Sequence, residues 1–271
     1  MPQQTYSNFR SLNKSDNANS NHKNITGLPA LLSKIQELNR DPALDDMIKR
    51  CRDIVEGEEK YVEASCSPLT PLQARIIQET HKDSNTSQYA YMLSGAVGGC
   101  FIKHIAEIAR AKRILEIGMF TGFSAVTFSE TSNCEEMVCL EIDPNMEKFV
   151  RSRLQGTDVE NKIRIILGSA QESLAKLKQE GKTFDLIYID ANKNGYLDYY
   201  KYIMDNGLLE RITGVILCDN ILWSNTTMDQ STEGGKDLHE FVQFVLQDQR
   251  VEQMIIPISD GIFMIKSKSS D

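Results

Sequence analysis

From Arg113 onward, short apolar runs alternate with amphipathic segments, and this alternation restricts the fold more than any other feature of the chain. The runs RILEIG, MVCLEI, KIRIIL, FDLIYI and GVILCD are mostly apolar, as expected of strands that are buried on both faces. The segments between them carry apolar residues at helical spacing. The pattern therefore predicts an α/β fold with a Rossmann-like, doubly wound parallel sheet.

The end of the chain departs from this alternation. VEQMIIPISDGIFMIKSK contains two apolar runs joined around Ser259, Asp260 and Gly261, which predicts an antiparallel hairpin. With the five preceding strands, this hairpin makes a seven-stranded sheet. A terminal hairpin is less typical of dehydrogenases than of other Rossmann-like proteins.

The N-terminal part is expected to lack strands. Residues 1–25 are polar, rich in Asn and Ser, and without the apolar region of a secretory signal, so we expect a disordered tail. Residues 26–110 are predicted to form helices and residues 111–271 the Rossmann-like core. Together, residues 26–271 are expected to form a single domain.

The composition excludes several classes of function. The chain has 271 residues, a formal net charge of −8 and no visible basic patch, which disfavours nucleic acid and an anionic membrane as partners. No apolar run approaches the roughly 20 residues that cross a bilayer. The six cysteines lack C-x-x-C pairs, which disfavours zinc or a disulfide framework and favours reduced thiols in a cytoplasmic protein.

Acidic and amide side chains follow the fourth and fifth predicted strands. Asp190 ends FDLIYID, and Asp219 and Asn220 end GVILCDN. Each alone could cap a helix or form a turn, but together at neighbouring strand ends they favour a site for Mg²⁺ or Ca²⁺. Lys193 follows closely in the sequence. It is either a solvated lysine or, beside a cation that makes its ammonium lose a proton more readily, a general base.

The first predicted strand leads into a glycine turn. GMFTGF, with Gly118 and Gly122, is not the G-x-G-x-x-G fingerprint, which favours a ligand without phosphates. Glu141 ends the second strand, where an acid can accept hydrogen bonds from both ribose hydroxyls. The missing glycine and the terminal hairpin favour S-adenosylmethionine over NAD. Trp223 fits the wall of an aromatic acceptor pocket and core packing equally well.

Together these segments resemble the motifs of the cation-dependent O-methyltransferases, the family of caffeoyl-CoA and catechol O-methyltransferases. LEIGMFTGFSA resembles the first motif of that family, YIDANKNGY its Asp-Ala-Asp-Lys-x-x-Tyr segment, and CDNILW its Asp-Asn-x-Leu-Trp segment. The match in order and spacing extends from about Met92 to Trp223. Asn192 stands where the family often has a second Asp. Ser224 replaces an Asn that the caffeoyl-CoA branch uses toward its substrate, which weakens the expectation of that ester.

The resemblance implies a set of site residues. Lys193 is implied as the catalytic base, Asp190 as a catalytic residue near the methionine part of the cofactor, and Trp223 as a substrate contact. Metal ligation is implied for Asp190, Asp219 and Asn220. Contacts to S-adenosylmethionine are implied for Ser94, Glu116, Gly118, Met119, Phe120, Ser124, Glu141, Ala170 and Asp190. A homodimer is the expectation for the family.

The predicted reaction is methyl transfer from S-adenosylmethionine to one hydroxyl of a vicinal dihydroxy small molecule, such as a catechol. Mg²⁺ or Ca²⁺ would acidify that hydroxyl, and Lys193 would remove its proton. An alternative acceptor is a cyclohexenone with adjacent oxygens, of the deoxygadusol type. The alternatives from other classes are an NAD-dependent oxidoreductase, which the glycine pattern disfavours, and an inactive methyltransferase fold that acts as a binding module. The sequence leaves the acceptor, the cation and the oligomeric state open.

Overall fold

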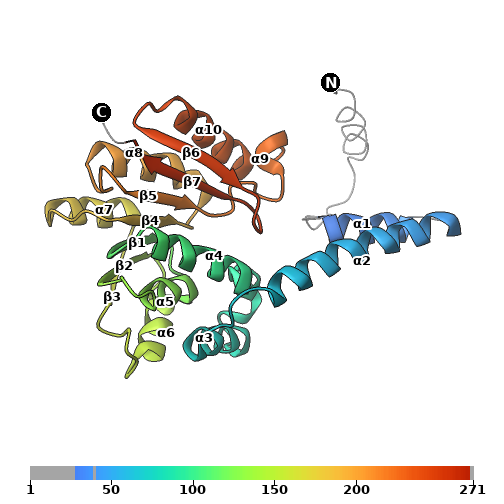
Figure 1. Ribbon diagram of the computed structural model, residues 1–271, viewed down its shortest axis with the longest axis horizontal. Helices are drawn as coiled ribbons and strands as arrows, with labels where there is room; N and C mark the ends of the chain where they lie inside the picture. Colours follow the sequence, from blue (N-terminus) through green and yellow to red (C-terminus); the bar gives the residue numbers. More distant parts are fainter. Residues whose placement is uncertain (1–27, 39–40, 269–271) are drawn as a thin grey trace. The chain divides into compact units, whose positions relative to one another are not determined.

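The computed structural model describes residues 28–38 and 41–268, which fall into two compact units divided between Glu56 and Gly57 (Figure 1). The predicted tail over residues 1–25 lies outside the described residues. The expected division at residue 110, between N-terminal helices and core, falls inside the second unit.

The described part of the first unit is helical. It contains α1 (Leu28–Leu38) and most of α2 (Pro42–Ala64). Arg52 of α2 donates a hydrogen bond to Gln36 Oε1 of α1 at 2.9 Å, which ties the two helices together. Among the described residues, no helix combines the length and the apolarity that a membrane span requires.

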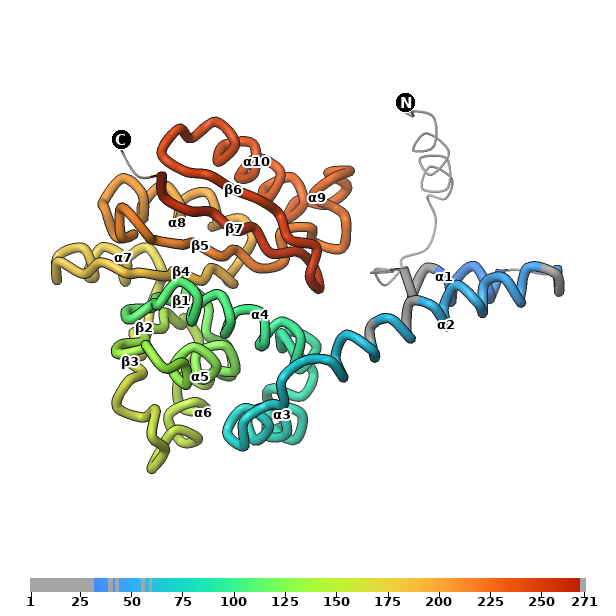
Figure 2. The backbone as a smooth tube through the Cα atoms, viewed as in Figure 1, coloured from blue at the N-terminus to red at the C-terminus, as the bar shows by residue number. Residues whose placement is uncertain are grey.

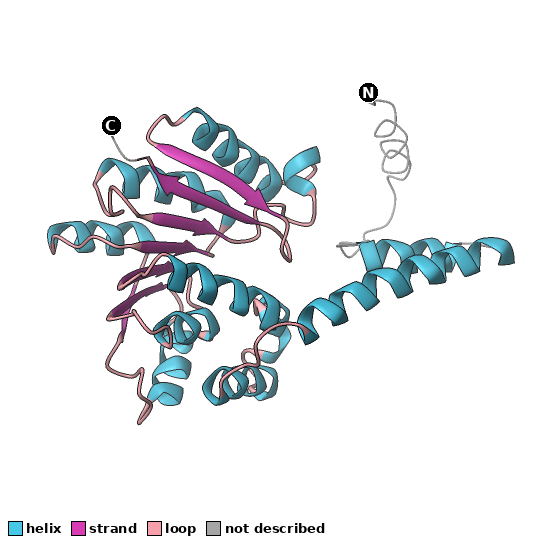
Figure 3. Ribbon diagram, viewed as in Figure 1, coloured by secondary structure: helices cyan, strands magenta, loops and turns pink. Residues whose placement is uncertain are grey.

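The second unit is built around one mixed sheet of seven strands. Its strands are β1 (Arg113–Ile117), β2 (Glu136–Glu141), β3 (Ile163–Leu167), β4 (Leu186–Ile189), β5 (Val215–Cys218), β6 (Val251–Ile256) and β7 (Ile262–Ser267). The spatial order is β3-β2-β1-β4-β5-β7-β6, and β1 to β5 are parallel (Figure 3). The β6–β7 hairpin adds antiparallel to β5, with Cys218 opposite Phe263 (Figure 2). The predicted Rossmann-like sheet with a terminal antiparallel hairpin is confirmed.

Helices precede β1 and connect the later strands. They are α3 (Pro71–Lys82), η1 (Ser87–Met92), α4 (Gly95–Ile108), α5 (Phe123–Ser129), α6 (Pro144–Leu154), α7 (Ala170–Gln179), η2 (Lys193–Gly195), α8 (Tyr196–Asp205), α9 (Thr226–Asp229) and α10 (Glu233–Gln247). Several begin with a side-chain cap. Asp143, for example, accepts from the backbone N–H of Asn145 at 2.8 Å, and Pro144 opens α6.

Side chains alternate between the two faces along each strand, and both faces are buried at β1, β2, β4 and β5, whereas the edge strand β6 is only partly buried. Leu115 and Ile117 of β1 belong to the apolar cluster that contains residues of α7, α8 and α10. Ile114 belongs to the other cluster, with residues of α3, α4, α5 and α6. Burial on both faces explains why the strands are continuous apolar runs rather than alternating ones.

Candidate active site

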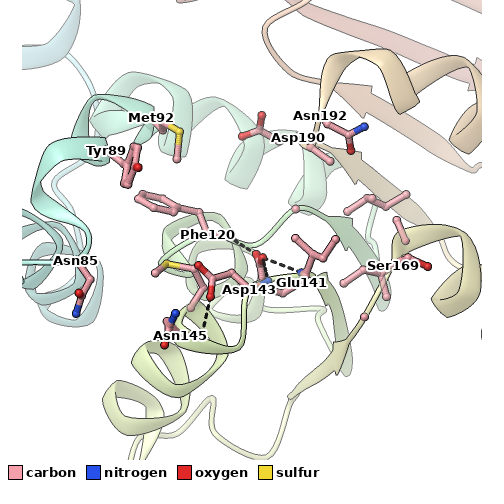
Figure 4. Close-up of a pocket in the computed structure, with 18 of the residues that line it drawn as sticks. Asn85, Tyr89, Met92, Phe120, Glu141, Asp143, Asn145, Ser169, Asp190 and Asn192 are labelled. Carbon is pink, nitrogen blue, oxygen red and sulfur yellow. Dashed lines mark hydrogen bonds between the residues drawn. The ribbon is translucent and has the colours of Figure 1, made fainter.

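The carboxyl ends of the parallel strands open into a cavity of about 910 Å³. Since β1 lies between β2 and β4, the connections after β1 and β4 diverge at this edge, as is usual for ligand sites in open α/β sheets. The loops after β1, β2, β3 and β4 line the cavity, together with a segment from Ser84 to Met92 (Figure 4). The volume lies within the range of about 300–1,000 Å³ that small-molecule sites occupy.

Gly118 makes the turn after β1 and must be glycine. Its φ is +91°, and a Cβ there would overlap the carbonyl oxygen of Asp190 and lie 2.8 Å from its carbon. The backbones approach because the ladder continues past the strands: Asp190 N donates to Ile117 O at 2.9 Å, and Gly118 N to Leu140 O at 3.0 Å. Because Gly118 has no side chain, the backbone of Asp190 can pack directly against the turn.

Glu141 organises the same turn from the end of β2. Its Oε2 accepts from the backbone N–H groups of Met119 at 3.1 Å and Phe120 at 2.9 Å. Its Oε1 accepts from Ile142 and Asp143, both at 2.8 Å. A carboxylate has about four acceptor sites, and these bonds use them. A ribose at Glu141 would share or replace some of these bonds, and the predicted ribose contact stays a prediction.

Glu116 lies below the cavity in the middle of β1, with its side chain fully buried. The Ser124 hydroxyl donates to its Oε1, whereas Oε2 has no hydrogen-bond partner within the described part of the chain. Burial raises the pKa of this carboxyl to about 8, although hydrogen bonds to Ser124 and Cys139 act in the opposite direction. Glu116 is therefore a buried acid that favours its protonated form when no ligand is bound.

The predicted cofactor contacts divide into two groups. Those that line the cavity are Gly118, Phe120, Glu141, Ala170 and Asp190. Those that do not line it are Ser94, Glu116, Met119 and Ser124.

Lys193 stands at the centre of a polar cluster beyond β4 and β5. Its Nζ donates to Asp190 Oδ1 at 3.1 Å, to Asn220 Oδ1 at 2.8 Å and to the Tyr196 hydroxyl at 2.7 Å. Only 8% of its side chain is exposed. Tyr196 in turn donates to the Asp219 carbonyl oxygen at 3.0 Å. The lysine is thus held in one place by residues from two strand ends and α8.

Asp219 lies at the edge of this cluster and is buried. Its Oδ2 accepts from the Tyr188 hydroxyl, and its Oδ1 accepts from the backbone N–H of Asn220 at 2.7 Å. Burial and the nearby charge of Asp190 raise the pKa of its carboxyl to about 6, against the effect of these bonds. The charge of Lys193 acts in the opposite direction and lowers this pKa.

The oxygen donors fit a hard divalent cation. The carboxylate of Asp190 and the amide of Asn220 both direct an oxygen at one positive atom, Nζ of Lys193, and Asp219 adjoins them. Carboxylate and amide oxygens are the ligands that Mg²⁺ and Ca²⁺ take. Over residues 28–38 and 41–268, no group of three or more His, Cys, Asp or Glu side chains could hold a metal ion. The predicted metal set stays a prediction.

Tyr188 and Tyr196 were not among the predicted site residues, although both hydroxyls bond within this cluster. A signal existed for Tyr188. It stands two residues before Asp190 in a strand, and such residues share a face. For Tyr196 the signals were its position after Lys193 at helical spacing and its place as the final Tyr of the segment that resembles Asp-Ala-Asp-Lys-x-x-Tyr.

Trp223 follows Asn220 in the loop after β5. Its side chain is 37% exposed, and its ring centroid lies 5.3 Å from Lys193 Nζ. Of the two interpretations that the sequence left open, its position beside the lysine fits a pocket wall better than a core residue. Its contact with a substrate stays a prediction.

Comparison with known proteins points to one family. The O-methyltransferase family profile matches residues 64–268. The probable caffeoyl-CoA O-methyltransferase 3 of Dictyostelium discoideum is 26% identical over 228 residues, covering 77% of this chain and 89% of the relative. The flavonoid 3',5'-methyltransferase of Vitis vinifera is 29% identical over 181 residues, covering 62% of this chain and 75% of the relative.

Two solved structures have the same architecture. The SAH-bound methyltransferase PaMTH1 of Podospora anserina has a TM-score of 0.71 and 28% identity, covering 80% of this chain and 96% of its own. The O-methyltransferase TomG of Streptomyces achromogenes, in complex with SAM, has a TM-score of 0.69. It is 20% identical, covers 79% of this chain and 96% of its own, and shows the fold alone.

Proposed function

The chain belongs to the O-methyltransferase family, and we propose that it moves a methyl group from S-adenosylmethionine to one hydroxyl of a vicinal dihydroxy small molecule, aided by a divalent cation. One observation carries the proposal. Lys193 donates hydrogen bonds to both Asp190 and Asn220, and Asp190 also lines the cavity together with Gly118 and Glu141. Methyl donor and acceptor would meet at that junction.

The cavity would hold the methyl donor. Gly118, Phe120 and Glu141 supply backbone and carboxylate groups on one side, and Ala170 lines the other. The methyl donor supplies an electrophilic methyl group on a sulfonium. The SAH-bound relative PaMTH1 supports this choice. The roughly 7–11 kcal/mol that positioning can contribute to such a transfer would come from this rigid, strand-end framework.

Asp190, Asp219 and Asn220 would hold the cation, which supplies Lewis acidity toward the acceptor hydroxyl. Asp190 borders both the cavity and the cluster, so it links the two binding sites. Lys193 would take the proton from the hydroxyl, and Tyr196 holds its Nζ in place for that step. Trp223 would support a flat acceptor beside Lys193.

A test uses labelled S-adenosylmethionine with a panel of catechols, hydroxycinnamoyl-CoA esters and cyclohexenones. Transfer to a catechol that EDTA abolishes and Mg²⁺ restores is the expected result. Full activity in excess EDTA, with the protein verified to be metal-free, would contradict the proposed role of the divalent cation. Transfer to a cyclohexenone alone would favour the alternative acceptor class, and cofactor binding without transfer would favour a binding module.

Asp219→Ala should lose turnover while the fold survives with a free energy of unfolding lower by about 1–3 kcal/mol, because no apolar core packing is lost but the buried Tyr188 hydroxyl loses its acceptor. A circular-dichroism melt checks the fold. A matched control is Asp229→Ala, since Asp229 also accepts a backbone hydrogen bond but lies in an exposed turn. Equal loss of turnover in both variants would contradict a specific role for Asp219.

A further inference from the structure

The loop after β5 contains an unusual backbone segment. Trp223, Ser224 and Asn225 are consecutive and all left-handed, with φ of 46°, 53° and 69°. This region is unfavourable for residues other than glycine and persists only where the surroundings hold it. Something outside the segment must therefore stabilise it.

The tip of the β6–β7 hairpin contacts this segment. Backbone carbonyls of Gly261 and Asp260 accept from Ile221 N at 3.0 Å and Leu222 N at 2.9 Å. A third bond reaches further: Asp260 Oδ1 accepts from the backbone N–H of Ser224 at 2.6 Å. This bond is made by a side chain and enters the left-handed segment itself. It joins residues 36 apart in sequence.

The segment places the indole of Trp223. The ring lies 5.3 Å from Lys193 Nζ. Gly234, near the start of α10, also lies next to the indole, because a Cβ there would come 2.9 Å from Trp223 Nε1. With 37% of the side chain exposed, the indole is not core. An exposed aromatic face beside the reacting groups suits a flat aromatic ring, which stacks offset or edge-on.

We propose that Asp260 is a positioning residue that holds Trp223 beside Lys193 through the Ser224 N–H and thereby shapes the acceptor side of the site. Asp260 acts through the backbone and touches neither donor nor acceptor. The acceptor half of this inference rests on the proposed function. The effect of Asp260 on the position of Trp223 does not.

The test compares three variants with the wild-type protein. Asp260→Ala removes the acceptor of the Ser224 hydrogen bond, whereas Asp260→Asn keeps an acceptor oxygen in place. Asp229→Ala is the matched control, because Asp229 Oδ1 likewise accepts a backbone N–H, that of Ser231 at 2.9 Å. Trp223 is the single tryptophan of the chain, so intrinsic fluorescence reports on this indole alone.

For Asp260→Ala we expect a red-shifted emission and stronger acrylamide quenching in the protein without substrate. With catechol as acceptor, its KM should rise about tenfold, or about 1.4 kcal/mol, the scale of one charge-assisted hydrogen bond. The KM for S-adenosylmethionine should stay within about twofold, because the cavity lining is unchanged. Asp260→Asn and Asp229→Ala should behave as the wild-type protein does.

Wild-type emission and quenching in Asp260→Ala would overturn the inference, as would equal changes in Asp229→Ala. A fluorescence change without a change in the catechol KM would overturn the acceptor half. If the wild-type protein methylates no catechol, the proposed function fails, yet the fluorescence comparison still decides the role of Asp260. If the alanine variant does not fold, hydrogen exchange at the Ser224 amide of the wild-type protein tests the hydrogen bond to Asp260 instead. Slow exchange at Ser224 supports the inference, and exchange at the solvent rate overturns it.

Discussion

Replacing Gly118 by alanine should damage the protein far more than the same change at Gly156. Both glycines have a positive φ, +91° and +75°, so both variants pay for a left-handed alanine, about 1–2 kcal/mol. The two positions differ in the room available for a Cβ atom. At Gly156 a Cβ would meet nothing within 4 Å, whereas at Gly118 it would meet the backbone of Asp190 and Ala191.

The expected magnitudes follow from this difference. Backbone cannot rotate away as a side chain does, so relieving the overlap at Gly118 adds a cost like that of overpacking, about 1–3 kcal/mol. The free energy of unfolding should therefore fall by roughly 2–5 kcal/mol in Gly118→Ala and by about 1–2 kcal/mol in Gly156→Ala. The entropic effect of alanine on the unfolded chain is common to both and cancels in the comparison.

Urea unfolding, followed by circular dichroism, measures both losses. Calorimetry with S-adenosylmethionine adds a second measurement, because the overlap at Gly118 displaces Asp190, which lines the cavity. We expect weaker cofactor binding in Gly118→Ala and unchanged binding in Gly156→Ala. Equal destabilisation of the two variants would refute the reasoning, since left-handed strain would then be the whole effect.

Substitutions at three further positions test the site. Lys193→Ala should lower kcat by about 10²–10⁴-fold with cofactor affinity retained. Lys193→Arg should not restore kcat, because guanidinium stays protonated. Near-wild-type turnover in the arginine variant would mean that Lys193 acts only as a positioning charge and not as a base. Glu141→Ala should weaken S-adenosylmethionine binding by about 1.5–3 kcal/mol in calorimetry, and unchanged affinity would argue against a cofactor contact. The variant should also have a lower melting temperature, because four backbone N–H groups lose their acceptor. Because the pKa of Glu116 is raised in the folded protein, its contribution to stability is complete below about pH 4.5 and is lost as pH rises toward about 8. The cofactor-free protein should therefore lose stability over this range relative to Glu116→Gln. Parallel curves of unfolding free energy against pH for the two proteins, measured with urea, would contradict this.

The order of strands and helices could be predicted from the sequence because burial leaves a local pattern. Continuous apolar runs such as FDLIYI predict strands covered on both faces, and the two runs around Asp260 predict the hairpin. Asp190 and Asp219 end neighbouring strands, so their proximity followed from strand order alone. The Gly118 turn was also visible, since glycine marks positions where backbones approach or φ is positive.

Tertiary structure decided which atoms meet. The convergence of Asp190 and Asn220 on Lys193 Nζ depends on side-chain rotamers and on the left-handed φ of Asn220, neither of which leaves a periodic pattern. Glu141 was predicted to bind ribose, but only the turn geometry shows that four backbone N–H groups already surround it. Asp260 reaches Ser224 only because β7 pairs with β5, which brings a late hairpin against an earlier loop. Local sequence determines which elements form, and the pairing of distant elements determines which side chains can act together.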